Sequence, residues 1–96
     1  MATSIISNYL KVKRATATVT TNANGFINTY GVINVQTKVP LQAYVYSDSY
    51  PNGLIGTLLC TSSSRYGNYW IRVTDSGTGN AITSTSVEVT IYYDEI

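Results

Sequence analysis

The fold class is decided by the stretch Ser86-Val87-Glu88-Val89-Thr90-Ile91-Tyr92-Tyr93, in which apolar and polar side chains alternate. A period of two residues is typical of a β-strand that buries one face. Residues 69–74 repeat this pattern, and no segment of the chain shows sustained helical spacing. These two stretches therefore predict an all-β protein.

Similar segments precede these two, and Gly, Pro, Asn or Asp residues punctuate them. Strands at this spacing predict a single antiparallel β-sandwich of jelly-roll or immunoglobulin-like type with about seven short strands. We expect one domain over residues 1–96, in which residues 1–8 form a flexible N-terminal segment. The predicted strands are residues 10–20, 26–30, 32–37, 41–46, 54–61, 69–74 and 86–93.

Two irregularities are expected in these strands. Leu10 and Val12 have the opposite parity to Ala15, which predicts a β-bulge near residues 13–14. Pro40 cannot donate to a central ladder, so we expect it to end the strand that covers residues 32–37.

The composition indicates a neutral, polar surface. Only 11 % of residues are charged and the net charge is +1, whereas an average soluble domain has roughly 25 % charged residues. So small a net charge produces no long-range electrostatic field that would attract nucleic acid or an anionic membrane, and we expect neither as a partner. The one basic cluster, Lys11, Lys13 and Arg14, is interpreted as the solvated side of the first strand.

The single cysteine, Cys60, excludes an internal disulfide and is expected to be a buried, inert thiol. The N-terminal residues carry neither the basic region nor the apolar core of a signal peptide, and no stretch is long enough to span a membrane. We therefore expect folding in a cytosol.

The inventory of reactive side chains argues against catalysis. The chain has no histidine, which removes the commonest general base and the commonest zinc ligand. One cysteine cannot form a thiolate metal site, and no phosphate-binding loop is present. Asp48 and Asp75 open turns, where capping of the local backbone is their expected role rather than calcium binding. We predict no enzyme activity, no metal and no cofactor.

The alternation sorts the strand residues into two sets. One set is aliphatic and is expected to form the core of the sandwich. Its members are Ala17, Val19, Leu41, Ala43, Val45, Ile71, Val73, Val87, Val89 and Ile91.

The opposite parity should face water, yet in three strands it carries Tyr44, Tyr46, Trp70, Arg72 and Tyr92. Three interpretations are open: cross-strand pairing on a solvated sheet, a subunit interface, and a ligand platform. We favour the subunit interface, because Tyr and Trp combine a large apolar face with a polar group.

The stretch 67–73, the Gly/Ser/Asn loop after it and the stretch 86–93 resemble the terminal β-sandwich domains of bacteriophage fibre and receptor-binding proteins. Residues 16–30, which are rich in Thr, Asn and Gly, are similar to those domains in composition. The resemblance implies a homotrimer that is made in the host cytoplasm, becomes part of the virion and contacts a bacterial surface polysaccharide. It carries no catalytic residues across.

The leading hypothesis is therefore a virion structural and adhesion domain, such as a fibre, head-fibre or receptor-binding module. The loop residues expected to contact a glycan are Tyr50, Asn52, Arg65, Tyr66 and Asn68. The alternative hypothesis is a small phage or bacterial inhibitor that binds one host protein.

Overall fold

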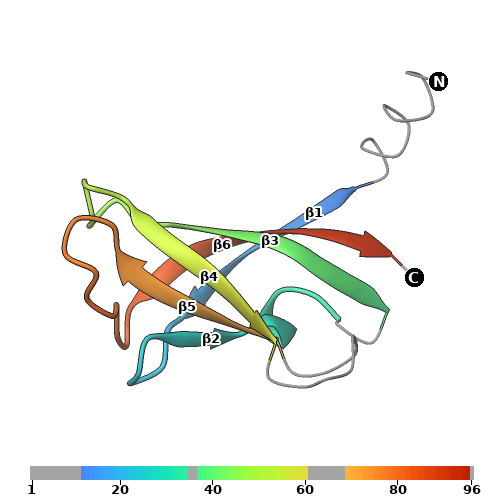
Figure 1. Ribbon diagram of the computed structural model, residues 1–96, viewed down its shortest axis with the longest axis horizontal. Helices are drawn as coiled ribbons and strands as arrows, with labels where there is room; N and C mark the ends of the chain where they lie inside the picture. Colours follow the sequence, from blue (N-terminus) through green and yellow to red (C-terminus); the bar gives the residue numbers. More distant parts are fainter. Residues whose placement is uncertain (1–11, 35–36, 61–68, 96) are drawn as a thin grey trace.

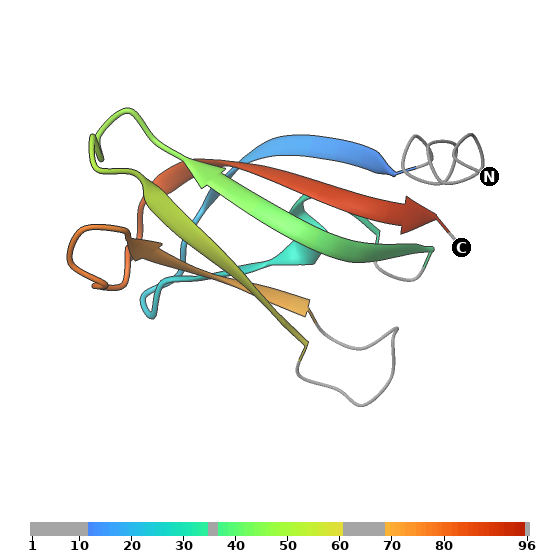
Figure 2. The same ribbon diagram turned by 45° about the horizontal axis from the view of Figure 1, so that its top comes forward.

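The computed structural model of the chain describes residues 12–34, 37–60 and 69–95, and it contains two antiparallel three-stranded sheets that pack face to face (Figures 1 and 2). Sheet 1 has the order β1-β6-β3, and sheet 2 has the order β2-β5-β4. The strands are β1 (Lys13–Thr20), β2 (Phe26–Asn28), β3 (Lys38–Tyr46), β4 (Leu54–Cys60), β5 (Tyr69–Asp75) and β6 (Ser86–Glu95). The predicted all-β sandwich is confirmed, with six named strands in the described residues.

Some predictions fall outside the part of the chain that the structure describes. They concern the N-terminal segment 1–8, Lys11, the side chain of Cys60, and the loop residues Arg65, Tyr66 and Asn68.

The core lies between the two sheets, and the central strands β5 and β6 supply its most buried side chains. Ile71, Val73, Val89 and Ile91 have no exposed surface. Ala17 and Val19 are half-buried, because β1 is the edge of sheet 1. The predicted core residues that the structure confirms as buried are Ala43, Val45, Ile71, Val73, Val87, Val89 and Ile91.

Strand β3 corrects two predictions, because it runs through Pro40 instead of beginning after it. The register with β6 shifts between Pro40 and Gln42, so the bulge lies here. The shift leaves Leu41 on the outside of the sheet at 52 % exposure, and its assignment to the core is wrong. Proline is tolerated at this place because β3 is an edge strand and a bulge disrupts the local ladder.

The bulge expected at residues 13–14 is not observed. Strand β1 pairs with β6 without a break, from Lys13 opposite Tyr93 to Thr20 opposite Ser86. The parity of Leu10, which suggested the bulge, belongs to residues before the paired segment.

The prediction of a strand at residues 32–37 is wrong at residues 32–34 and 37, which the structure describes, because local capping competes with strand formation. The Asn28 side chain accepts a hydrogen bond from the Tyr30 N–H (3.0 Å) and caps a short 3-10 helix, η1 (Thr29–Gly31). The Ile33 N–H then bonds to the Thr29 carbonyl (2.9 Å), and the Ile33 side chain is buried. The segment thus contributes to the core from a compact turn.

A second capped turn joins the two sheets and places Phe26. The Asn22 side-chain oxygen accepts the N–H groups of Asn24 and Phe26, each at 2.9 Å. Gly25 has a φ of 82°, a conformation that favours glycine, and its carbonyl accepts the Val73 N–H (2.9 Å). The turn therefore fixes Phe26 at the start of β2, beside the centre of sheet 2.

The bulge in β3 yields a matched pair of predictions. Val45→Ala is expected to lower the free energy of unfolding by about 2 kcal/mol, because Val45 faces the core. Leu41→Ala is expected to change it by less than about 0.5 kcal/mol, because Leu41 faces solvent. Urea denaturation of both variants measures this difference, and equal losses would contradict the placement of the bulge.

Candidate functional site

The five predicted interface residues do not lie on one face. Tyr44, Tyr46 and Tyr92 belong to the outer face of sheet 1, whereas Trp70 and Arg72 belong to the outer face of sheet 2. The alternation of apolar and polar residues in the sequence predicts which side chains point inward and which point outward. It does not predict to which of the two sheets a strand belongs. The molecule therefore has two distinct aromatic outer faces on opposite sides of its core.

The outer face of sheet 1 is built on tyrosine and threonine. The rings of Tyr44 and Tyr92 meet edge to face, with centroids 5.7 Å apart and an interplanar angle of 84°. The hydroxyls of Thr16 and Thr90 lie 3.0 Å apart in a hydrogen bond. Cross-strand pairing of aromatic rings is thus present, but it leaves Tyr44 at 53 % exposure.

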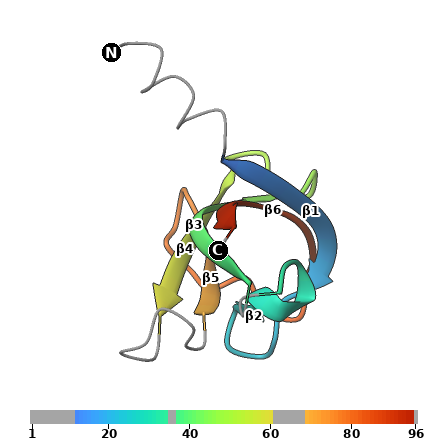
Figure 3. The same ribbon diagram turned by 90° about the vertical axis from the view of Figure 1, so that its right-hand side faces the viewer.

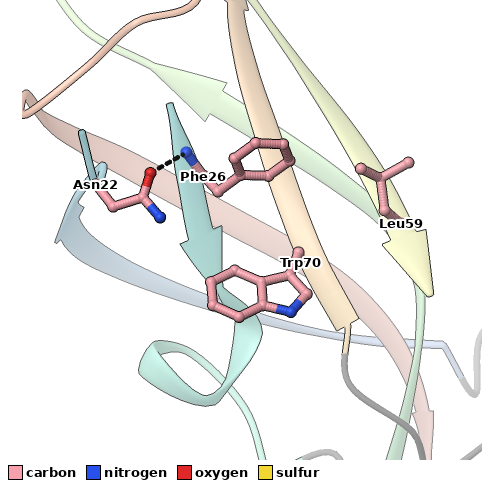
Figure 4. Close-up of a pocket in the computed structure, with 4 residues that line it drawn as sticks. All are labelled: Asn22, Phe26, Leu59 and Trp70. Atoms are coloured by element: carbon pink, nitrogen blue, oxygen red, sulfur yellow. Dashed lines mark hydrogen bonds between the residues drawn. The ribbon is translucent and has the colours of Figure 1, made fainter. Parts of the chain in front are cut away.

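The outer face of sheet 2 is more apolar and is hollowed. Phe26, Leu59 and Trp70 project from three neighbouring strands and, with Asn22, line a hollow of about 270 Å³ (Figure 4). Leu59 stands opposite Trp70 in the register of β4 and β5. The bond from the Phe26 N–H to Asn22 forms part of the rim.

Three of the four lining residues, Asn22, Phe26 and Leu59, were not predicted as site residues from the sequence. The sequence does contain an indication of Leu59, because residues 54–61 are mostly apolar at both inward and outward positions. A strand with apolar side chains on both faces is expected where its outer face is also covered. Ile55 extends the apolar surface along β4 and is half exposed. Phe26 is found only through the pairing of β2 with β5.

A second candidate site lies at the turn between β3 and β4, at the left end of Figure 1. Tyr46, Asp48 and Tyr50 lie on the wall of a hollow of about 360 Å³. The Tyr46 hydroxyl donates a hydrogen bond to the Asp48 carboxylate. This bond, together with the negative charge of Asp48, raises the pKa of the Tyr46 phenol, so the phenol stays protonated and holds the carboxylate in place.

The expected role of Asp48 as a cap of its own turn is therefore corrected. The Ser47 hydroxyl oxygen accepts the Ser49 N–H instead (3.3 Å), and Asp48 bonds to Tyr46. A serine one position earlier in the turn takes over the capping, which leaves the carboxylate beside the hollow.

The predicted role of Asp75 is confirmed. Its carboxylate accepts the N–H groups of Gly77 (2.7 Å) and Thr78 (3.2 Å), so it caps the turn that follows β5. The Asn52 carbonyl accepts the Ser76 hydroxyl, which ties this turn to the β3–β4 turn. Of the described glycan candidates, Tyr50 lines the hollow, whereas Asn52 belongs to the β3–β4 turn and bonds to Ser76 in the turn after β5.

No family model, curated protein or solved structure matches this chain. In residues 12–34, 37–60 and 69–95 no helix has the length and apolar character to cross a membrane. The same residues contain no group of three His, Cys, Asp or Glu side chains that could hold a metal ion.

Proposed function

We propose that this protein is a non-enzymatic structural and adhesion module of a bacteriophage virion, and that it assembles with copies of itself. The observation that carries the proposal is the exposed apolar hollow of Phe26, Leu59 and Trp70 on sheet 2. The resemblance of residues 67–73 and 86–93 to phage fibre domains supports the placement in a virion.

Self-assembly accounts for the hollow through the hydrophobic effect. Apolar side chains that gather in a contiguous exposed surface favour an interaction site, because monomeric proteins rarely expose contiguous apolar patches larger than about a few hundred Å². Aromatic residues and arginine are enriched in protein interfaces, and sheet 2 presents Phe26, Trp70 and Arg72 together. A domain of 96 residues also buries a modest share of its surface, so association adds stability that the core alone does not provide.

The adhesion half of the proposal rests on the hollow at the β3–β4 turn. The rings of Tyr46 and Tyr50 offer flat apolar surfaces to the C–H faces of a sugar, and the Asp48 carboxylate accepts hydrogen bonds from its hydroxyls. The volume of about 360 Å³ falls in the range of small-ligand sites. We propose a bacterial cell-surface polysaccharide as the ligand.

Sedimentation velocity over protein concentrations of about 1–100 µM tests the assembly half. We expect the sedimentation coefficient to rise with concentration to that of an oligomer, with a trimer as the expected species. A monomer across the whole range contradicts the proposal.

An array of immobilised bacterial cell-surface polysaccharides tests the adhesion half. We expect binding to a subset of them, and a blank array contradicts it. Capture of a single host cytosolic protein by the immobilised chain, together with a blank array, favours the inhibitor hypothesis instead.

A further inference from the structure

We infer that copies of this chain pack head to tail, with the outer face of sheet 2 of one copy against the outer face of sheet 1 of the next. This inference rests on the proposed self-assembly and names the surface that each copy offers to its partner. Three features favour this arrangement: the charges on the central strand of each face, the aromatic side chains near them, and the cost of the alternative arrangements.

The exposed charges on the central strands of the two outer faces have opposite sign: sheet 2 presents Arg72, and sheet 1 presents Glu88 and, toward the C-terminal end of β6, Asp94. Arg72 lies on β5 between Phe26 and Thr57 in the registers of its two neighbours. Glu88 lies on β6 between Tyr46 and Thr18. Within the described residues neither Arg72 nor Glu88 has an ion-pair partner. Each face thus presents an unpaired charge among aromatic groups.

Twofold packing of one face on itself would place like charges in the same interface. Sheet 2 against sheet 2 buries two Arg72 side chains beside the apolar hollow, with no acidic residue on the described part of that face. Sheet 1 against sheet 1 gathers the carboxylates of Glu88 and Asp94 from both copies, and these outnumber the Arg14 side chains of the same face. A charge that is removed from water without a partner is costly, and like charges across an interface add repulsion. Head-to-tail packing gives Arg72 of one copy the Glu88 of the next.

The head-to-tail arrangement also matches the aromatic groups of the two faces. It places the Phe26 and Trp70 rings against the exposed edge of the Tyr44–Tyr92 pair, where offset and edge-to-face contacts between rings are favourable. A twofold dimer covers only one of the two faces in each copy. A copy within a head-to-tail assembly covers both. Because the two faces lie on opposite sides of the core, repetition extends an open fibre rather than closing a trimer, so the size distribution in sedimentation velocity distinguishes this arrangement from the trimer expected above.

Complementation between two blocked variants tests this arrangement. Trp70→Asp blocks the face of sheet 2, and Tyr44→Asp blocks the face of sheet 1. We expect each variant alone to associate at least about 30-fold more weakly than the unchanged protein. An equimolar mixture should form a heterodimer, because each variant keeps one intact face, and sedimentation velocity measures it.

The controls separate folding from assembly. Thr83→Asp adds the same charge at an exposed loop position, and it should leave the sedimentation coefficient unchanged. Circular dichroism checks that each variant is folded, and Leu59→Asp replaces Trp70→Asp if the latter unfolds, since Leu59 is partly exposed.

Charge reversal supplies a second, independent readout. Arg72→Glu and Glu88→Arg should each weaken association about 10-fold or more, and the double variant should recover most of it. Two results would overturn the head-to-tail arrangement while leaving self-assembly in place. One is undiminished association of Tyr44→Asp, and the other is an equimolar mixture of Trp70→Asp and Tyr44→Asp that associates no better than either variant alone. A monomeric unchanged protein would overturn self-assembly itself, so the two failures are distinguishable.

Discussion

Ile71→Ala is expected to lower the free energy of unfolding by about 4 kcal/mol, near the upper end of the range for truncation of a buried aliphatic side chain. Ile71 has no exposed surface and lies on the central strand of sheet 2, opposite Ile27 on one side and Leu58 on the other. It faces Gly56, where an added Cβ would lie 3.4 Å from its Cγ2. The neighbouring strands are held by hydrogen bonds to β5 on both sides, so they cannot move in to fill the cavity left by the truncation. The cost of an unfilled cavity therefore adds to the lost burial of the side chain.

Thermal unfolding followed by circular dichroism measures this loss. For a domain of 96 residues, about 4 kcal/mol corresponds to a drop in Tm of about 20 °C. Thr57→Ala is the control, because Thr57 lies on the outer side of the same sheet and is exposed. We expect it to change the free energy of unfolding by less than about 0.5 kcal/mol. A loss below about 1.5 kcal/mol for Ile71→Ala would contradict the close packing of the core at this position.

The sequence could predict the central strands because their patterns are local. In β5 and β6 every second residue is aliphatic, and each of those from Ile71 to Val73 and from Val87 to Ile91 is buried. The inward and outward residues of the edge strand β3 were harder to predict, because a β-bulge reverses the alternation while the residue types stay the same. Leu41 looks like Ala43 in the sequence, and only the pairing with β6 separates them.

One local and one long-range hydrogen bond explain why residues 32–34 and 37 do not form the predicted strand. Residues 32–37 have the apolar content of a strand, but Asn28 caps the turn before them and the Thr29 hydroxyl bonds to the Tyr69 carbonyl (3.0 Å). The latter bond joins residues 40 positions apart, so no short-range pattern reveals it. Thr29 is fully buried, which a threonine in a polar stretch does not suggest.

The candidate sites show the same division between local and long-range information. The aromatic residues with outward parity were identified, but their division between two faces depends on which strands pair. The proposed role of Asp48 in ligand binding rests on its hydrogen bond to Tyr46. Because the two residues are only two positions apart, the sequence could have suggested this bond. The sequence assigned no role to Glu88, and its position opposite Tyr46 on the central strand of sheet 1 became visible only from the register.

Asp48→Ala is expected to weaken binding to the polysaccharide that gives the strongest array signal by about 10–100-fold, the range for a hydrogen bond to a charged group. In the turn hollow Asp48 is the acceptor that Tyr46 holds in place, and it faces the space beside Tyr50. Tyr46→Phe keeps the ring but releases the carboxylate, so we expect a smaller loss of about 3–10-fold. Biolayer interferometry with the immobilised polysaccharide measures both variants.

Asp94→Ala provides the matched control for this experiment. Asp94 is an exposed carboxylate near the C-terminal end of β6. This end of the sandwich lies opposite the β3–β4 turn in Figure 1 and faces the viewer in Figure 3. Its removal changes the net charge by the same amount, so a general electrostatic effect would weaken binding in both variants alike. A specific site predicts that Asp94→Ala binds like the unchanged protein. Equal losses in Asp48→Ala and Asp94→Ala, or no loss in either, would move the glycan site away from the β3–β4 turn.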